Sequence, residues 1–145
     1  MIFLTGDTHR DFGRIFDFCE KMKTTKEDIL IILGDAGINW VDKNKDNKRK
    51  RNLQENLPIT LFCIHGNHEN RPTNIPTYKE VPFHRGIAYI EEEYPNIIFA
   101  KDGEIYDFNN KKCLVIGGAY SVDKGYRLAL FEKDKLRHPR NAVCS

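Results

Sequence analysis

Three short apolar runs mark the first half of the chain, and a glycine follows each run directly or after one residue. The runs are residues 1–5, 29–33 and 59–64. Continuous apolar runs of this length are typical of strands that are buried on both faces of a sheet. The pattern therefore predicts three buried strands, each opening into a loop.

The segments between these runs predict one clear helix and one polar element. Residues 42–54 are almost wholly polar and basic, which predicts a solvated helix or loop. Residues 11–23, with Asp11 as the expected N-cap, carry four apolar side chains at helical spacing: Phe12, Ile15, Phe16 and Cys19. A strand–helix–strand–helix–strand order is typical of a parallel sheet covered on both faces, so we expect an α/β fold.

The second half of the chain has a different pattern. Residues 72–83 hold three of the six prolines and predict an irregular loop. Turns are predicted at Asp102-Gly103 and Asn109-Asn110, and short strands at residues 87–90, 97–100, 104–108 and 113–116. These elements predict a β-meander that leads into Gly117-Gly118. No repeat or linker divides the chain, so we expect residues 1–145 to form a single domain.

Composition narrows the class of protein. The chain has 145 residues, 40% hydrophobic and 30% charged, and a formal net charge of +2. This balance gives no strong electrostatic attraction to nucleic acid or to a membrane surface. No apolar run approaches the roughly 20 residues of a membrane helix, and the first residues lack the basic start of a signal peptide. The four cysteines form no C-x-x-C pair, which argues against a zinc ribbon or disulfide framework. We expect a cytoplasmic protein.

Polar side chains follow each of the three predicted strands. They are Asp7-Thr8-His9, Gly34-Asp35 and Gly66-Asn67-His68-Glu69. Because the carboxyl ends of parallel strands meet at one edge of a sheet, these loops should converge. Converging carboxylates repel one another unless a cation lies between them. The donors Asp7, His9, Asp35 and Asn67 are oxygens and an imidazole without a thiolate, a set that suits divalent Mn, Fe or Zn.

The order and spacing of these three motifs resemble the D-x-H, G-D and G-N-H-[D/E] motifs of the calcineurin-like metallophosphoesterases. The stretch from Gly117 to Ser121 also resembles a glycine-rich strand end of bacterial members. The resemblance covers residues 1 to about 127. It implies an αββα sandwich, of which this chain would supply the N-terminal part. It also implies hydrolysis of a phosphomonoester or phosphodiester at a dinuclear metal site.

The resemblance implies a role for each motif residue. Asp7 and His9 would bind the first divalent ion, and Asp35 would bridge both ions. Asn67 would bind the second ion and lie close to the substrate. His68 would sit by the substrate phosphate, where it would protonate the leaving oxygen or stabilise the charge of the transition state. Substrates in reach of the family include small phosphate esters and phosphoproteins.

Other side chains near the motifs have two interpretations each. Glu69 resembles the acidic partner that orients the third loop. Arg10 would contact a substrate phosphate through two parallel hydrogen bonds, or form a surface salt bridge. Arg71 has the same two interpretations. Trp40 would line the crevice or pack in the core. Further candidates that we expect to be structural or solvated are His65, His84 and Tyr120.

The sequence departs from the family pattern after Gly118. The family site is completed by a later histidine and a G-H-x-H motif, which this sequence lacks; only His138 follows. Residues 129–145 resemble nothing in the family. Two explanations stay open: a truncated phosphoesterase, or a shortened, catalytically impaired relative that serves as a binding or regulatory module. In both cases we expect one ion or weak metal binding.

Two expectations concern partners. A sandwich without its second half would expose an apolar face, which predicts association of two copies of the chain. The basic stretch 43–51 keeps nucleic acid open as a partner, although it has no aromatic residue on which a base could stack. A solvated face is the simpler interpretation of this stretch.

Overall fold

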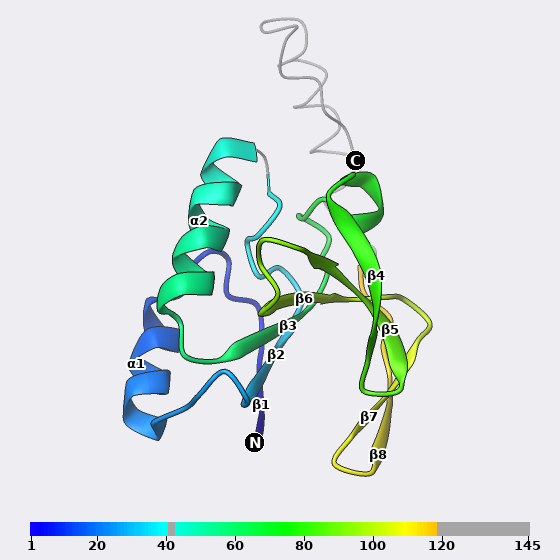
Figure 1. Ribbon diagram of the computed structural model, residues 1–145, viewed down its shortest axis with the longest axis horizontal. Helices are drawn as coiled ribbons and strands as arrows, with labels where there is room; N and C mark the ends of the chain where they lie inside the picture. Colours follow the sequence, from blue (N-terminus) through cyan, green and yellow to red (C-terminus); the bar gives the residue numbers. More distant parts are fainter. Residues whose placement is uncertain (41–42, 119–145) are drawn as a thin grey trace, which may run out of the picture.

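The three predicted strands lie side by side in a six-stranded sheet (Figure 1). The first was expected to be buried, but it lies at the edge of the sheet and none of its residues is buried. The computed structural model describes residues 1–40 and 43–118. In chain order the strands of this sheet are β1 (Ile2–Thr5), β2 (Ile29–Leu33), β3 (Thr60–Ile64), β4 (Tyr78–Phe83), β5 (Gly86–Glu91) and β6 (Ile97–Ala100). Their order in space is β1-β2-β3-β6-β5-β4. The first four strands are parallel, and the β6–β5 and β5–β4 pairings are antiparallel. The loops that follow β1, β2, β3 and β6 therefore meet at one edge.

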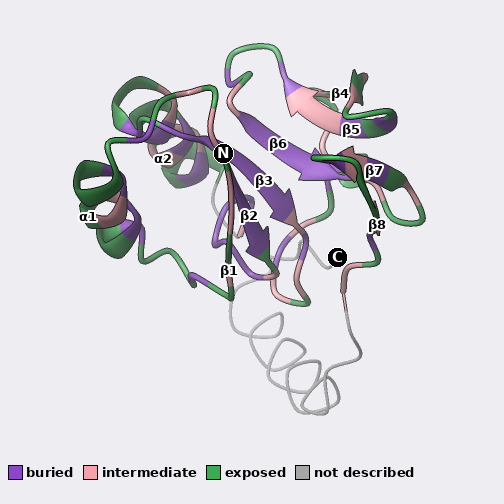
Figure 2. Ribbon diagram, turned by 90° about the horizontal axis from the view of Figure 1, so that it is seen from below, coloured by how far each residue is buried: buried purple, intermediate pink, exposed green. Residues whose placement is uncertain are grey.

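Two helices cover one face of this sheet (Figures 1 and 2). They are α1 (Gly13–Met22) and α2 (Lys43–Asn56), and their buried residues share one core cluster with the sheet. Asp11 accepts a hydrogen bond from the Gly13 N–H (3.2 Å), although the N-cap position falls on Phe12. Figure 2 shows that buried residues concentrate on the central strands β2, β3 and β6.

A hairpin covers the opposite face, and its strands β7 and β8 span Ile105–Phe108 and Lys111–Leu114. Tyr106 is fully buried and donates a hydrogen bond from its hydroxyl to the Ile87 carbonyl (2.6 Å). Its ring packs against Phe62 of β3 with the two rings nearly perpendicular. The sheet is therefore covered on both faces, by helices on one side and by a hairpin on the other. This mixed α/β arrangement is the predicted fold class.

The prediction of an irregular loop at residues 72–83 was wrong in part. A 3₁₀ turn occupies Pro72–Asn74, but residues 78–83 form β4. Pro82 misled the prediction, because a proline lacks the N–H that a central strand needs. β4 is the edge strand of the sheet, where a strand has a neighbour on one side only. A proline is tolerated there.

The predicted meander was wrong in part, because β5 and β6 are antiparallel neighbours as expected but β6 does not pair with β7. Of its strands, β6 lies parallel to β3 in the large sheet, whereas β7 and β8 pair only with each other. The turn at Asn109-Asn110 is confirmed, and both residues have positive φ (53° and 63°), which matches the twist of a two-residue hairpin turn. Because this turn is so short, β8 begins at Lys111, two residues earlier than predicted.

The basic stretch is a helix. It was predicted to be solvated, but part of it is buried. Lys50 of α2 is 3% exposed and forms an ion pair with Glu91 at the end of β5. Its ammonium group also lies 5.2 Å from the ring centroid of Tyr78. Leu53 is buried one turn further along the helix. Part of the positive charge of α2 therefore holds the helix against the sheet.

Among the described residues, the hairpin does not cover the part of the sheet face that β1 and β2 form. Leu4 pairs with Ile31 and Leu33 pairs with Ile64, so both leucines project on the hairpin side. They are 66% and 48% exposed. The predicted association of two chains through an apolar face stays a prediction.

No helix in the described part of the chain is long and apolar enough to cross a bilayer.

We predict that replacing Glu91 destabilises the fold strongly. Glu91→Gln keeps the shape of the side chain but leaves the Lys50 charge buried without a counter-charge. Such a loss costs about 3 kcal/mol of the free energy of unfolding, which urea denaturation measures. The matched control is Glu92→Gln in the exposed Lys79–Glu92 pair, which should leave the midpoint unchanged. Equal shifts in the two variants would contradict the role assigned to the buried pair.

Candidate metal centre

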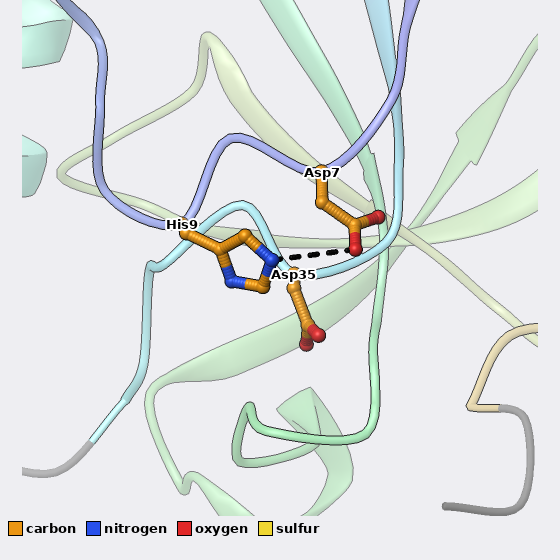
Figure 3. Close-up of side chains that lie close together, drawn as sticks. All are labelled: Asp7, His9 and Asp35. Atoms are coloured by element: carbon orange, nitrogen blue, oxygen red, sulfur yellow. Dashed lines mark ion pairs between the residues drawn. The ribbon is translucent and has the colours of Figure 1, made fainter.

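Asp7, His9 and Asp35 come together at the carboxyl ends of β1 and β2 (Figure 3). Each offers one ligand atom, and these atoms lie within 4.8 Å of one another. His9 Nε2 is 3.4 Å from Asp7 Oδ2. Asp7 and His9 are exposed, whereas Asp35 is 3% exposed. Two carboxylates and one imidazole at this separation are a donor set that fits a divalent cation.

Backbone hydrogen bonds join the loop after β1 to the loop after β2. The N–H of His9 donates to the Asp35 carbonyl (2.9 Å), and the N–H of Arg10 donates to the Ala36 carbonyl (3.2 Å). The buried Thr8 hydroxyl donates to the same carbonyl (2.8 Å). These bonds hold His9, Arg10 and Asp35 at positive φ (44°, 73° and 36°), a region that costs a non-glycine residue free energy.

The loop after β3 reaches the same place because Gly66 has no side chain. A Cβ at Gly66 would overlap both the side chain and the backbone of Asp35. The N–H of His68 donates to Asp35 Oδ1 (3.0 Å), which orients the carboxylate. Gly37 likewise lets the loop after β2 approach the loop after β1, because a Cβ there would overlap the backbone of Arg10. No role was predicted for Gly37, although the small pair Ala36-Gly37 directly follows Asp35 in the sequence.

Glu69 joins the loops after β2 and β3. Its carboxylate is buried and accepts hydrogen bonds from the N–H groups of Gly37 (2.6 Å), Ile38 (3.2 Å) and Gly66 (3.2 Å). Burial raises the pKa of Glu69 to about 7, while these three donors act in the opposite direction. Glu69 thus orients the third loop through the backbone, without offering its own oxygens to the metal cluster.

Three further side chains surround the cluster. His68 is half-buried, and its ring stacks on Trp40 with centroids 5.4 Å apart. The guanidinium carbon of Arg10 lies 4.7 Å from the Trp40 ring centroid. Trp40 therefore lines the centre and does not pack in the core. Asn67 is exposed between Gly66 and His68, and its role as a metal ligand stays a prediction.

The remaining candidates lie elsewhere. His65 is buried 3.4 Å from Asp102, and burial lowers its pKa. Arg71 lies 3.8 Å from the same carboxylate, at a cavity of about 180 Å³. His84 is in the exposed β4–β5 turn, with Nδ1 3.1 Å from the Asp107 carbonyl. Two more candidates, Tyr120 and His138, fall outside the described residues.

We predict that Gly66→Ala removes most of the metal affinity. The added Cβ must displace Asp35, which is the buried member of the cluster. Metal titration by calorimetry measures the loss. Gly6→Ala is the matched control, because Gly6 also adjoins a cluster residue but a Cβ there meets no atom within 4 Å. Equal affinities in the two variants would show that the approach of Gly66 to Asp35 does not set the site.

We also predict a pH dependence of stability that depends on Glu69. Between its ordinary pKa of 4.5 and its folded pKa of about 7, the folded state holds a proton that the unfolded chain has released. The free energy of unfolding should therefore fall as the pH rises through this window. The Glu69→Gln variant lacks this contribution. Urea denaturation of both metal-free proteins across the window should give curves of different slope, and parallel curves would refute the raised pKa.

Comparison with known proteins agrees with this geometry. A sequence model of the calcineurin-like phosphoesterases matches residues 1–142. Neither the curated proteins nor the solved structures gave a match. The matched range contains all three loops of the centre and nearly the whole chain. This protein belongs to the calcineurin-like phosphoesterase family.

Proposed function

We propose that this protein is a metal-dependent phosphoesterase that hydrolyses a phosphomonoester or a phosphodiester. The observation that carries the proposal is the cluster of Asp7, His9 and Asp35, whose ligand atoms lie within 4.8 Å of one another. This cluster falls in the motifs of a phosphoesterase family. A divalent ion bound there would supply Lewis-acid activation of water and of the phosphoryl group near neutral pH.

The donor set explains why a cation would bind at this place. Asp7 and Asp35 bring two carboxylates together, and a shared cation turns their repulsion into attraction. Asp35 is already oriented by the N–H of His68, so it need not lose side-chain freedom when an ion arrives. The exposure of Asp7 and His9 leaves the other side of the ion open to water and substrate.

The second ion of the proposed pair would be held by fewer charged ligands. Asp35 would bridge to it, and Asn67 would add a neutral oxygen. A divalent ion with so little charge compensation gains little by leaving water. We therefore propose one well-held ion and a second that binds weakly. Mn, Fe and Zn all suit the donors.

Two more residues would act on the substrate. His68 would hold a proton for the leaving oxygen, and Arg10 would contact a phosphate oxygen. Both contact Trp40, and the His68 ring lies 6.3 Å from the ring of the cluster residue His9. The substrate would be a small phosphate ester or a phosphoprotein.

Variants at Asp35 and His68 should distinguish metal binding from catalysis. We predict that Asp35→Asn loses more metal than Asn67→Ala, because Asp35 contributes a charge and serves both ions. His68→Ala should keep its metal and lose roughly 10²–10⁴-fold in turnover. Elemental analysis and Mn²⁺-dependent hydrolysis of a chromogenic phosphodiester and phosphomonoester measure the two properties.

The outcomes discriminate between the candidate functions. Turnover that survives in Asp35→Asn would refute the proposed centre, and full turnover in His68→Ala would refute its role as acid. Tight metal binding by the unaltered chain without turnover of either ester would favour a binding or regulatory module. Glu92→Gln, which is exposed, serves as the control that should change neither property.

A further inference from the structure

Trp40 lies where three residues of the proposed site meet. Its ring is nearly parallel to that of His68 (interplanar angle 14°, centroids 5.4 Å apart), and the Arg10 guanidinium lies 4.7 Å from its centroid. The His9 ring approaches it edge-on at 6.4 Å. One half-buried ring therefore touches a metal-cluster residue and both residues that would act on the phosphate.

The backbone before Trp40 is held independently of that ring. The N–H groups of Gly37 and Ile38 donate to Glu69, and the N–H of Asn70 donates to the Asn39 carbonyl (2.8 Å). These bonds tie the segment before Trp40 to the loop that carries His68. The position of the indole is thus set by the same loop whose histidine it stacks on.

The backbone of Trp40 is also tied to α2. Its N–H hydrogen-bonds to the buried Asp46, and burial raises the pKa of that carboxyl. Arg49, one turn along the helix, donates to the Gly37 carbonyl (3.2 Å). The backbone that carries the indole is therefore tied both to the loop after β3 and to α2.

We propose that Trp40 is a positioning residue that holds His68 and Arg10 in the direction of the bound phosphate. The inference rests on the roles proposed above for His68 and Arg10. An indole face attracts a guanidinium and offers a flat surface to an imidazole. Contact with the ring restricts the rotation of both side chains, so the ring reduces the number of arrangements that they sample. A group that acts only through orientation changes kcat more than metal affinity.

Kinetics of two variants test the positioning role. Trp40→Leu removes the aromatic face and should lower kcat about tenfold, in keeping with the modest energy of such ring contacts. Metal content should not change. Trp40→Phe keeps a flat ring and should restore most of the lost kcat. Equal kcat in the unaltered protein and Trp40→Leu, or a loss of kcat in step with a loss of metal, would overturn the proposal.

Fluorescence tests the same contacts without turnover, because Trp40 is the only tryptophan of the chain. A histidine ring in contact with an indole quenches its emission, so His68→Ala should raise the emission of Trp40. Inorganic phosphate added to the Mn²⁺-loaded protein should change the emission as it engages Arg10. The control is His84→Ala, which removes an exposed histidine that contacts Phe83 and Phe108 and should leave the emission unchanged.

The two measurements keep the inference separate from the proposed function. No turnover by the unaltered chain would refute the phosphoesterase activity. The emission measurements alone would then test the role of Trp40. Emission that is the same in His68→Ala and His84→Ala would overturn the positioning role even in an active enzyme. The emission comparison also remains decisive if Trp40→Leu does not fold, because it uses the native tryptophan.

Discussion

The close approach of the loops after β2 and β3 is the constraint on which the rest of the centre depends. Gly66 lies so near Asp35 that no side chain fits between them. This contact lets the N–H of His68 reach the Asp35 carboxylate and lets Glu69 span to the other loop. Any residue larger than glycine would separate the two loops and, with them, the metal cluster from the proposed acid.

In the loops of the centre, backbone hydrogen bonds offset unfavourable backbone conformations. Three non-glycine residues of the centre, His9, Arg10 and Asp35, have a backbone conformation that is unfavourable in isolation. Two of them donate backbone hydrogen bonds to the neighbouring loop, and the third accepts one of these bonds. The geometry is therefore preorganised before any ligand binds, which is what a site that orients charged groups requires.

Helix α2 supports the centre, and a buried ion pair attaches this helix to the sheet. α2 is polar along almost its whole length, and apolar packing alone could not hold it firmly. The buried Lys50–Glu91 pair and the Leu53 contact supply that attachment, and α2 in turn supports the segment before and at Trp40. A helix that the sequence shows as a charged surface is in fact part of the frame of the site.

The sequence alone was sufficient for the three strands β1, β2 and β3, although not for the exposure of β1, and for the helix after the first strand, the fold class and the family. Each rests on a local signal: an apolar run of fixed length, a helical spacing, or a short motif directly after a strand. It also singled out Asp7, His9 and Asp35, because parallel strands end at one edge whatever lies between them. The pairing of β6 with β3, the strand at residues 78–83, the burial of Lys50 and the stacking of His68 on Trp40 were decided by tertiary structure. In the β6–β3 pairing, the burial of Lys50 and the stacking of His68, the partner is distant in the chain, so no local pattern of residues could contain it. The strand at residues 78–83 pairs with its neighbour β5, but only the sheet order decides that it lies at an edge, where Pro82 is tolerated.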